Sequence, residues 1–198
     1  MIRREIYMEK VRRFIDKPVV KVITGMRRCG KSVILKLIRE ELAQRGIPPE
    51  QILYFNFESM GIAFLREADA LYAFIANIAR QQQSSQRRPK RLYIMLDEVQ
   101  RIAQWEQAVA SFRVDLNCDI YITGSNSKLL SGNIAELLAG RYVEIRIHPL
   151  SFAEHLNFTA AMGEDKGKDL NRQFADYLQY GGLPGIHEMD INSDAVTP

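Results

Sequence analysis

The order of hydrophobic and polar residues along the chain predicts short buried strands separated by amphipathic helices. Apolar runs rich in β-branched and aromatic residues predict five strands, at residues 19–24, 51–59, 91–98, 119–127 and 141–147. Apolar residues that recur every three or four positions predict helices at residues 3–16, 33–46, 67–80, 104–116 and 134–140. In the first of these helices, the expected apolar face contains Ile6, Val11 and Phe14.

Strands that alternate with helices predict an α/β fold with a parallel sheet, because parallel neighbours need long crossover connections. In such a sheet, a ligand binds outside the carboxyl ends of the strands. Residues suited to chemistry follow the expected strand ends: Gly25, Asn56, Asp97, Glu98, Ser125 and Asn126. The pattern therefore predicts one site at that edge of the sheet.

The pattern changes at Pro149, where two helical segments begin, at residues 150–158 and 169–182. The last residues contain few apolar side chains, and we expect them to fray. These changes predict a core at residues 1–148, a helical lid or linker at 149–186 and a disordered tail at 187–198.

Composition narrows the class of protein. The chain has 198 residues, of which 46% are hydrophobic, as expected of a globular domain. Its net charge of +3 is too small to indicate nucleic-acid binding by itself. Cys29 and Cys118, without a CxxC spacing, predict neither a disulfide framework nor a zinc site. Two cysteines without such a framework fit a reducing cytoplasm best. No apolar run approaches the ~20 residues of a membrane span and no signal-peptide core is present, so we expect no membrane contact.

The segment GMRRCGKS, residues 25–32, fits the phosphate-binding pattern G-x-x-x-x-G-K-[ST]. Glycines let successive backbone N–H groups point at phosphate oxygens, and the helix that follows adds partial positive charge at its N-terminus. Lys31 supplies a mobile charge for the β- and γ-phosphates, and Ser32 offers a hydroxyl to Mg²⁺. We expect the nucleotide to contact Gly25, Arg27, Arg28, Cys29, Gly30, Lys31, Ser32 and Val33.

Three residues inside this loop have two interpretations. Arg27 and Arg28 are either phosphate ligands or the solvated tip of a basic loop. We interpret Cys29 as a small inert filler. The alternative is a reactive thiolate, because Cys29 would lie near a helix N-terminus between Arg28 and Lys31. The thiolate hypothesis predicts that alkylation blocks nucleotide binding and that ATP protects the thiol.

A second motif, LYIMLDE, ends the third expected strand with two carboxylates. An apolar run followed by Asp is the Walker B pattern, and we expect Asp97 to hold the Mg²⁺ shell through water. Glu98 is placed to polarise an attacking water, the alternative being a surface pair at a strand end. Ser125 or Asn126 is expected to reach that water or the γ-phosphate, unless both only form a turn.

The segments GMRRCGKS, LYIMLDE, ITGSNSKLL, LAGRYVEIRIHPLSFAE and YGGLPG together resemble the AAA+ superfamily of P-loop ATPases. In detail they resemble a branch of predicted bacterial and archaeal ATPases with an extra, uncharacterised C-terminal domain. The resemblance covers about residues 1–186 and implies a three-layer αβα fold with a five-stranded sheet of order 5-1-4-3-2. Because this chain ends at Pro198, the resemblance implies that the second domain is missing, and Arg172 is the candidate for a sensor 2 arginine.

The resemblance also implies roles for individual residues. Glu98 would be the catalytic base, and Ser125 with Asn126 would form sensor 1. Asn56 would hold Glu98 in an inactive pose, the simpler interpretation being a polar strand end. Arg141 matches the position of an arginine finger, which would stabilise charge on a neighbour's γ-phosphate in a homo-oligomer. The alternative is a structural arginine paired with a carboxylate.

These motifs predict Mg²⁺-dependent hydrolysis of ATP to ADP and phosphate, which would drive a conformational change in an attached domain or partner. The alternative is a nucleotide-gated switch or scaffold with little turnover. A small-molecule kinase would need an acceptor pocket and a lid arginine cluster, neither of which is clear, and no guanine-recognition motif favours GTP. Nucleic-acid binding is a further hypothesis, and its alternative is ordinary solvated charge. The basic residues concerned are Arg3, Arg4, Arg12, Arg13 and the loop 87–91.

Overall fold

A computed structural model describes residues 2–84, 90–124, 138, 140–163 and 169–185 of the chain. Its centre is a five-stranded sheet, made of β1 (Val20–Gly25), β2 (Ile52–Asn56), β3 (Leu92–Asp97), β4 (Cys118–Thr123) and β5 (Tyr142–Ile147). All neighbouring strands are parallel, and their order is β2-β3-β4-β1-β5. This confirms the expected α/β fold and the order 5-1-4-3-2, counted from the other edge.

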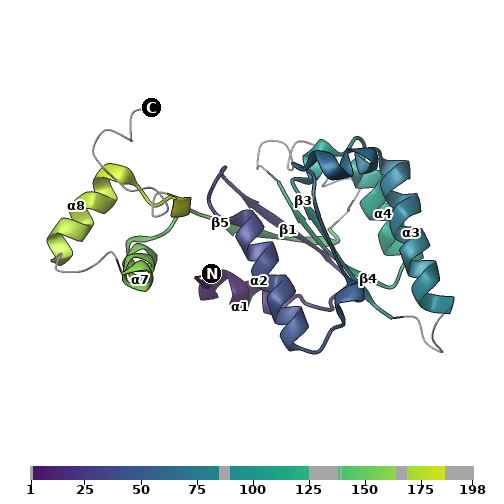
Figure 1. Cartoon of the computed structure of the whole chain (residues 1–198), viewed down its shortest axis with the longest axis horizontal. Helices are drawn as coiled ribbons and strands as arrows, with labels where there is room; N and C mark the ends of the chain where they lie inside the picture. The colour runs from purple at the N-terminus through teal and green to yellow at the C-terminus, as the bar shows by residue number, and fades with distance from the viewer. Residues whose placement is uncertain (1, 85–89, 125–137, 139, 164–168, 186–198) are drawn as a thin grey trace.

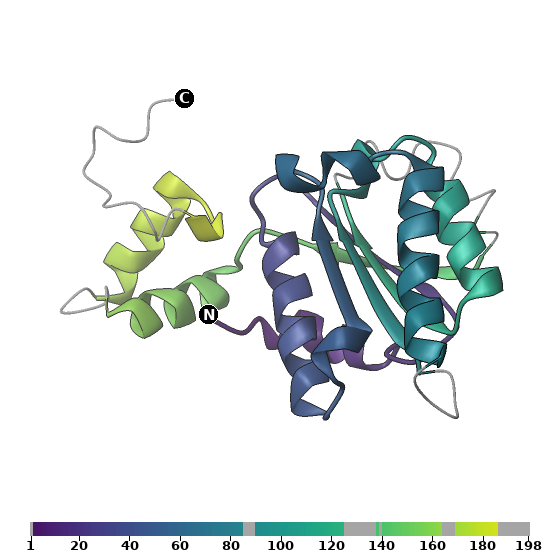
Figure 2. The same ribbon diagram turned by 45° about the vertical axis from the view of Figure 1, so that its right-hand side comes forward.

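Helices cover both faces of the sheet (Figures 1 and 2). α1 (Glu5–Arg12) and α2 (Lys31–Gln44) lie on one face, and α3 (Ala68–Ser84) and α4 (Trp105–Asp115) lie on the other. Alternation along β1 divides the core, since Val22 packs with α3 and α4 whereas Ile23 packs with α1 and α2. The molecule therefore has the three layers expected from the sequence.

The first helix differs from its prediction. It ends at Arg12, and Ile6, which we placed on its apolar face, is 57% exposed. Val11 is buried, as expected, and Tyr7 and Met8 are buried with it. The Tyr7 ring lies under Arg4, and its hydroxyl accepts a hydrogen bond from the His148 N–H at 3.1 Å. The expected helix at 134–140 lies largely outside the described residues.

Three short 3-10 turns were not predicted: η1 (Pro49–Gln51), η2 (Met60–Leu65) and η3 (Val99–Arg101). η1 leads into β2, whereas η2 and η3 follow the carboxyl ends of β2 and β3. β2 accordingly stops at Asn56, before the end of the strand that we predicted at residues 51–59.

The C-terminal helices α7 (Phe152–Met162) and α8 (Leu170–Tyr180) stand to one side of the sheet (Figure 1). α7 begins with a capping box, in which the Ser151 hydroxyl accepts from the Glu154 N–H and the Glu154 carboxylate accepts from the Ser151 N–H. Phe152 contacts Phe174 and Tyr177 and thereby joins the two helices. This pair occupies the segment 149–186 that we expected to form a lid or linker, and the expected tail at 187–198 lies outside the described residues.

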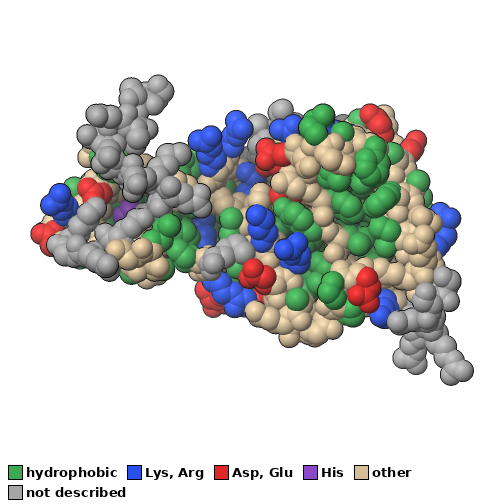
Figure 3. Space-filling view, in the orientation of Figure 1, with side chains coloured by type: hydrophobic (Ala, Val, Ile, Leu, Met, Phe, Trp, Pro, Cys, Tyr) green, Lys and Arg blue, Asp and Glu red, His purple; other side chains and the backbone are tan. Residues whose placement is uncertain are grey.

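Apolar side chains are exposed over the edge strand β2 and helix α3 (Figure 3). Met60, Phe64 and Phe74 are exposed by 75%, 64% and 38%. Phe74 makes edge contacts with Phe55 and Phe64, each with ring centroids 6.0 Å apart. These ring contacts keep part of the aromatic surface away from water. Among the described helices, none has the length and apolarity needed to cross a membrane.

Candidate nucleotide-binding site

β1 ends in a tight turn that leads directly into α2. The turn begins at Gly25, where a Cβ atom would lie 2.4 Å from the Ile147 carbonyl oxygen and 2.7 Å from the Cys29 sulfur, so only glycine fits. It ends at Gly30, whose left-handed φ of 102° turns the chain into the helix. The predicted phosphate-binding loop thus forms a glycine-bounded turn that ends at the N-terminus of α2.

Lys31 reaches back into this turn. Its ammonium donates to the carbonyl oxygens of Gly25 at 3.2 Å and Met26 at 3.1 Å, and its side chain is 5% exposed. The same nitrogen lies 4.0 Å from Oε1 of Glu98. The positive charge of Lys31 is therefore held at the loop, on the side that faces Glu98.

Asp97 is the meeting point of the polar groups at the carboxyl edge. It is fully buried, and it accepts hydrogen bonds from Ser32 Oγ at 3.1 Å, from Tyr54 at 2.8 Å and from Thr123 Oγ1. Burial, and then the charge of Asp97, raises the pKa of Tyr54, so its phenol remains a donor. Sequence reasoning identified Ser32 and Asp97 but missed Tyr54 and Thr123.

The hydroxyl of Ser32 and the carboxylate of Asp97 fit a magnesium site. Both are hard oxygen donors, and their 3.1 Å contact places them close enough to share one hydration shell. Mg²⁺ keeps several waters and accepts few protein ligands, so this pair is sufficient on the protein side. Bound there, the ion would neutralise charge on the β- and γ-phosphates.

Glu98 follows the strand in an unusual backbone conformation. Its φ is 58°, in the left-handed region, and its N–H donates to Thr123 Oγ1 at 2.9 Å. One carboxylate oxygen accepts from the side-chain amide of Gln100, and the other faces Lys31. The carboxylate is thus at the same edge as Lys31, Ser32 and Asp97, as expected.

The remaining loop residues differ in exposure. Arg27 and Arg28 are exposed, and Val33 is half-buried in the first turn of α2. Cys29 is fully buried against the core that α1 and α2 cover, and burial raises the pKa of its thiol. Of the two interpretations of Cys29, burial and the raised pKa of its thiol favour the inert filler over the thiolate, because desolvation outweighs the nearby charges of Lys31 and Arg4.

We therefore expect Cys29 to react slowly with iodoacetamide in the folded protein, with or without ATP. The physical reason is that both the raised pKa and the burial of the sulfur reduce access to the thiolate. The measurement is mass-spectrometric labelling of Cys29 over time, with a sample unfolded in urea as the control for full reactivity. Rapid labelling that ATP suppresses would restore the thiolate hypothesis.

A cavity of about 310 Å³ adjoins the loop. Its walls come from Ile2, from Gly30 and Val33 of the loop and α2, and from Phe158 of α7 and Pro184 after α8. This volume is at the lower end of the range for small-molecule pockets, which are mostly apolar. An apolar cavity next to a phosphate-binding loop suits a flat, largely apolar group attached to the phosphates.

The residues expected to hold Glu98 or to act as sensors are Asn56, Ser125, Asn126 and Arg172. The side-chain oxygen of Asn56 accepts from the Glu58 N–H at 2.9 Å, so in this structure Asn56 stabilises its own turn and the described contacts of Glu98 do not include it. Ser125 and Asn126 lie outside the described residues. Arg172 is exposed in the first turn of α8, where its N–H donates to Asp169 at 2.7 Å.

Arg141 lies at the amino-terminal ends of the strands, opposite the carboxyl ends where the loop begins. Its carbonyl oxygen accepts from the N–H of Val20, the first residue of β1, at 3.0 Å, whereas the loop begins at Gly25. Five residues of strand separate these two ends by roughly 16 Å. Within one chain, Arg141 therefore does not reach a nucleotide on the loop.

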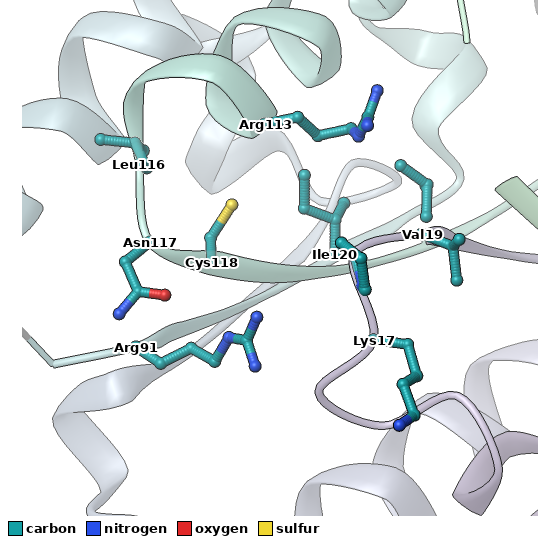
Figure 4. Close-up of a pocket in the computed structure, with 10 residues that line it drawn as sticks. Lys17, Val19, Arg91, Arg113, Leu116, Asn117, Cys118 and Ile120 are labelled. Atoms are coloured by element: carbon teal, nitrogen blue, oxygen red, sulfur yellow. The ribbon is translucent and has the colours of Figure 1, made fainter. Parts of the chain in front are cut away.

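A small basic pocket of about 160 Å³ lies near Arg141, lined among others by Lys17, Arg91 and Arg113. Figure 4 shows Arg91 and Arg113 extending on opposite sides of the start of β4. Burial lowers the pKa of Arg113, and the charge of Arg141 lowers it further. Because Arg91 is paired with Asp16 at 3.2 Å, the unbalanced positive charge at this end of the sheet comes from Arg113 and Arg141.

The basic residues near the N-terminus are engaged in ion pairs. Arg12 and Arg3 contact Glu41, and Arg12 also contacts Glu5. Arg4 is 4% exposed and forms a two-pronged contact with Glu154 at 2.8 and 3.0 Å. These pairings favour a structural role over nucleic-acid binding for Arg3, Arg4 and Arg12.

A parallel sheet of this order, with a glycine turn leading into a helix and a Ser–Asp pair at the carboxyl edge, defines a P-loop nucleotide-binding fold. Residues 17–156 match a family model described as an AAA domain. The chain belongs to this family of AAA domains.

Curated relatives are uncharacterized proteins. One from Haemophilus influenzae is 42% identical over 186 residues, which are 94% of this chain and 44% of that protein. One from Methanocaldococcus jannaschii is 31% identical over 180 residues, which are 86% of this chain and 37% of that protein. The chain therefore spans less than half the length of these relatives.

Two solved structures share the fold. Cdc6p from Pyrobaculum aerophilum has a TM-score of 0.54 and 16% identity, with 82% of this chain and 49% of that chain covered. PCH-2 from C. elegans has a TM-score of 0.54 and 14% identity, with 84% and 49% covered. At this level of identity the likeness concerns the fold alone.

Proposed function

We propose that the chain binds ATP with Mg²⁺ and hydrolyses it to ADP and phosphate. The observation that carries the proposal is the convergence of Lys31, Ser32, Asp97 and Glu98 at one edge of the sheet, where Ser32 and Asp97 are in contact and Lys31 faces Glu98. Charge for the phosphates, oxygens for the ion and a carboxylate for water are thereby combined in one place.

Each group has a distinct role in this proposal. The loop N–H groups and the Lys31 ammonium bind the phosphates, and Ser32 and Asp97 hold the ion. Glu98 takes a proton from water as the water oxygen bonds to the γ-phosphorus, while the bond from that phosphorus to the β-γ bridging oxygen breaks and releases ADP. The apolar cavity beside Val33 and Pro184 receives the base.

We propose that binding is coupled to the C-terminal helices through Arg4. Its guanidinium donates to the carbonyl oxygens of Cys29 in the loop at 3.1 Å and of His148 after β5 at 2.8 Å. The same group binds Glu154 of α7. A change in loop conformation would thus reach α7 directly, in keeping with a lid or linker at 149–186.

We propose that Arg141 acts on a neighbouring copy, because it cannot reach the nucleotide of its own chain. Its place at the far edge, beside the positive charge of Arg113, suits a surface that faces another molecule's phosphates. A homo-oligomer would bring that edge to the loop of the next chain.

The test is phosphate release from ATP by the purified chain, with and without Mg²⁺, over a range of protein concentrations. We expect Mg²⁺-dependent release whose specific rate rises with protein concentration, and we expect Arg141→Ala to lose that rise. A rate per molecule that is independent of concentration would contradict the role of Arg141. ATP binding without release would support a nucleotide-gated switch, and absence of binding would reject the nucleotide site.

A further inference from the structure

The side chain of Gln100 is directed at the proposed catalytic base. Gln100 lies in η3, the turn that follows β3, and its amide nitrogen donates to Oε2 of Glu98. An ionised carboxylate only accepts hydrogen bonds, so the nitrogen of the amide, and not its oxygen, must face Glu98. The chemistry of the contact therefore fixes the orientation of the Gln100 side chain.

The other end of the amide has no such contact. Oε1 of Gln100 is buried, and among the residues that the structure describes none donates a hydrogen bond to it. Buried polar atoms are nearly always hydrogen-bonded, so an orphan acceptor at this place needs an explanation. Among the described residues, Gln100 does not join Glu98 to a wider network, and the side-chain hydrogen bond that it makes there goes to that carboxylate.

The backbone brings the two side chains together. Glu98 has a left-handed φ of 58°, which is sparsely populated for residues other than glycine and recurs at functional sites. This conformation is held by the hydrogen bond from the Glu98 N–H to Thr123 and by the bond from the Arg101 N–H to the Glu98 carbonyl at 3.1 Å. The chain thus turns back so that residue 100 faces residue 98.

We propose that Gln100 is the positioning residue of Glu98, an inference that rests on the proposed ATPase function. The Gln100 amide donates a hydrogen bond to Oε2 of Glu98, and Oε1 of Glu98 faces the Lys31 ammonium at 4.0 Å. When phosphates draw the ammonium toward themselves, Oε1 is left facing the γ-phosphate while Oε2 stays fixed. Gln100 thereby aims one defined oxygen of Glu98 at the attacking water.

The test compares Gln100→Met, which keeps the volume and removes the donor, with Gln107→Met on the exposed face of α4. We expect Gln100→Met to lower kcat by about 10- to 100-fold, because a small misplacement of a catalytic group has this cost. ATP affinity and Tm should match those of the control. Gln100→Glu, which is nearly isosteric and also lacks the donor, should lose at least as much.

A double mutant tests whether Gln100 acts through Glu98. In a Glu98→Gln background, measured by single-turnover release of labelled phosphate, adding Gln100→Met should cause no further loss. A full additional loss there, or a loss of ATP binding that matches the loss of kcat, would assign Gln100 a structural role and overturn the proposal.

The two proposals fail differently. If the unmodified chain releases phosphate and Gln100→Met does so at the same rate as Gln107→Met, only the role of Gln100 is rejected. If the unmodified chain releases none, the ATPase proposal and the inference on Gln100 both fall.

Discussion

Glu98→Gln is expected to release phosphate from ATP about 10²- to 10⁴-fold more slowly than the unmodified protein, the usual contribution of a positioned general base. The glutamine amide has the size of the carboxylate but does not take a proton from water. Lys31, which faces Glu98 at 4.0 Å, would lose a negative neighbour and remain available to the phosphates. ATP affinity should therefore be unchanged or slightly tighter.

Equilibrium binding of a fluorescent ATP analogue, measured beside phosphate release, separates these two effects. The matched control is Glu40→Gln on the exposed face of α2, which removes the same charge away from the site. Equal rates for Glu98→Gln and Glu40→Gln would place the base elsewhere. Loss of binding in Glu98→Gln would indicate that the carboxylate supports the loop and not the chemistry.

The sequence contained enough information for the sheet. Each strand is a short apolar run rich in β-branched and aromatic residues, and each helix repeats its apolar residues at helical spacing, so element types and approximate positions followed from run length, residue type and period. The order of the strands followed from the resemblance to AAA+ proteins, because period carries no information about which strands are neighbours. The 3-10 turns were missed since single turns have no repeating pattern.

Within the site, the residues that were predicted are those whose spacing is fixed along the chain. Lys31 and Ser32 follow a glycine at set offsets, and Asp97 ends an apolar run. Thr123 and Tyr54 were missed because each lies inside an apparently ordinary strand, and their contact with Asp97 depends on strand neighbours that are far apart in sequence.

Burial is the property that sequence conveyed least well. Cys29 was placed correctly between two basic residues, but its thiol packs inward and loses the solvation that a thiolate needs. Lys21 interrupts an apolar run and proves to be fully buried against Asp119, its ion-pair partner in β4. Neither outcome follows from neighbours in sequence: Cys29 is buried by packing with residues of α1 and α2, and Lys21 meets a partner on another strand.

Lys31→Ala is expected to weaken ATP binding by a factor on the order of 10² or more, since charge-assisted hydrogen bonds to phosphate contribute about 1.5–3 kcal/mol each. In the structure the ammonium is held over the turn by the carbonyl oxygens of Gly25 and Met26. These carbonyls compete only weakly with phosphate oxygens for a positive charge. The ammonium therefore remains close to where the phosphates would lie and needs little movement to bind them.

Lys36→Ala, on the exposed side of the same helix, is the control for loss of one positive charge. Titration with a fluorescent ATP analogue gives the affinity. Thermal unfolding shows whether loss of the Lys31 side chain, which contacts the Gly25 and Met26 carbonyl oxygens, destabilises the loop. We expect Tm to fall, because the Gly25 carbonyl is buried and loses its donor, whereas Met26 is exposed. Unchanged affinity in Lys31→Ala would mean that GMRRCGKS forms a strand-to-helix turn without binding phosphate. A loss of affinity that Lys36→Ala does not share would show that the Lys31 ammonium, held over the loop, binds the phosphates.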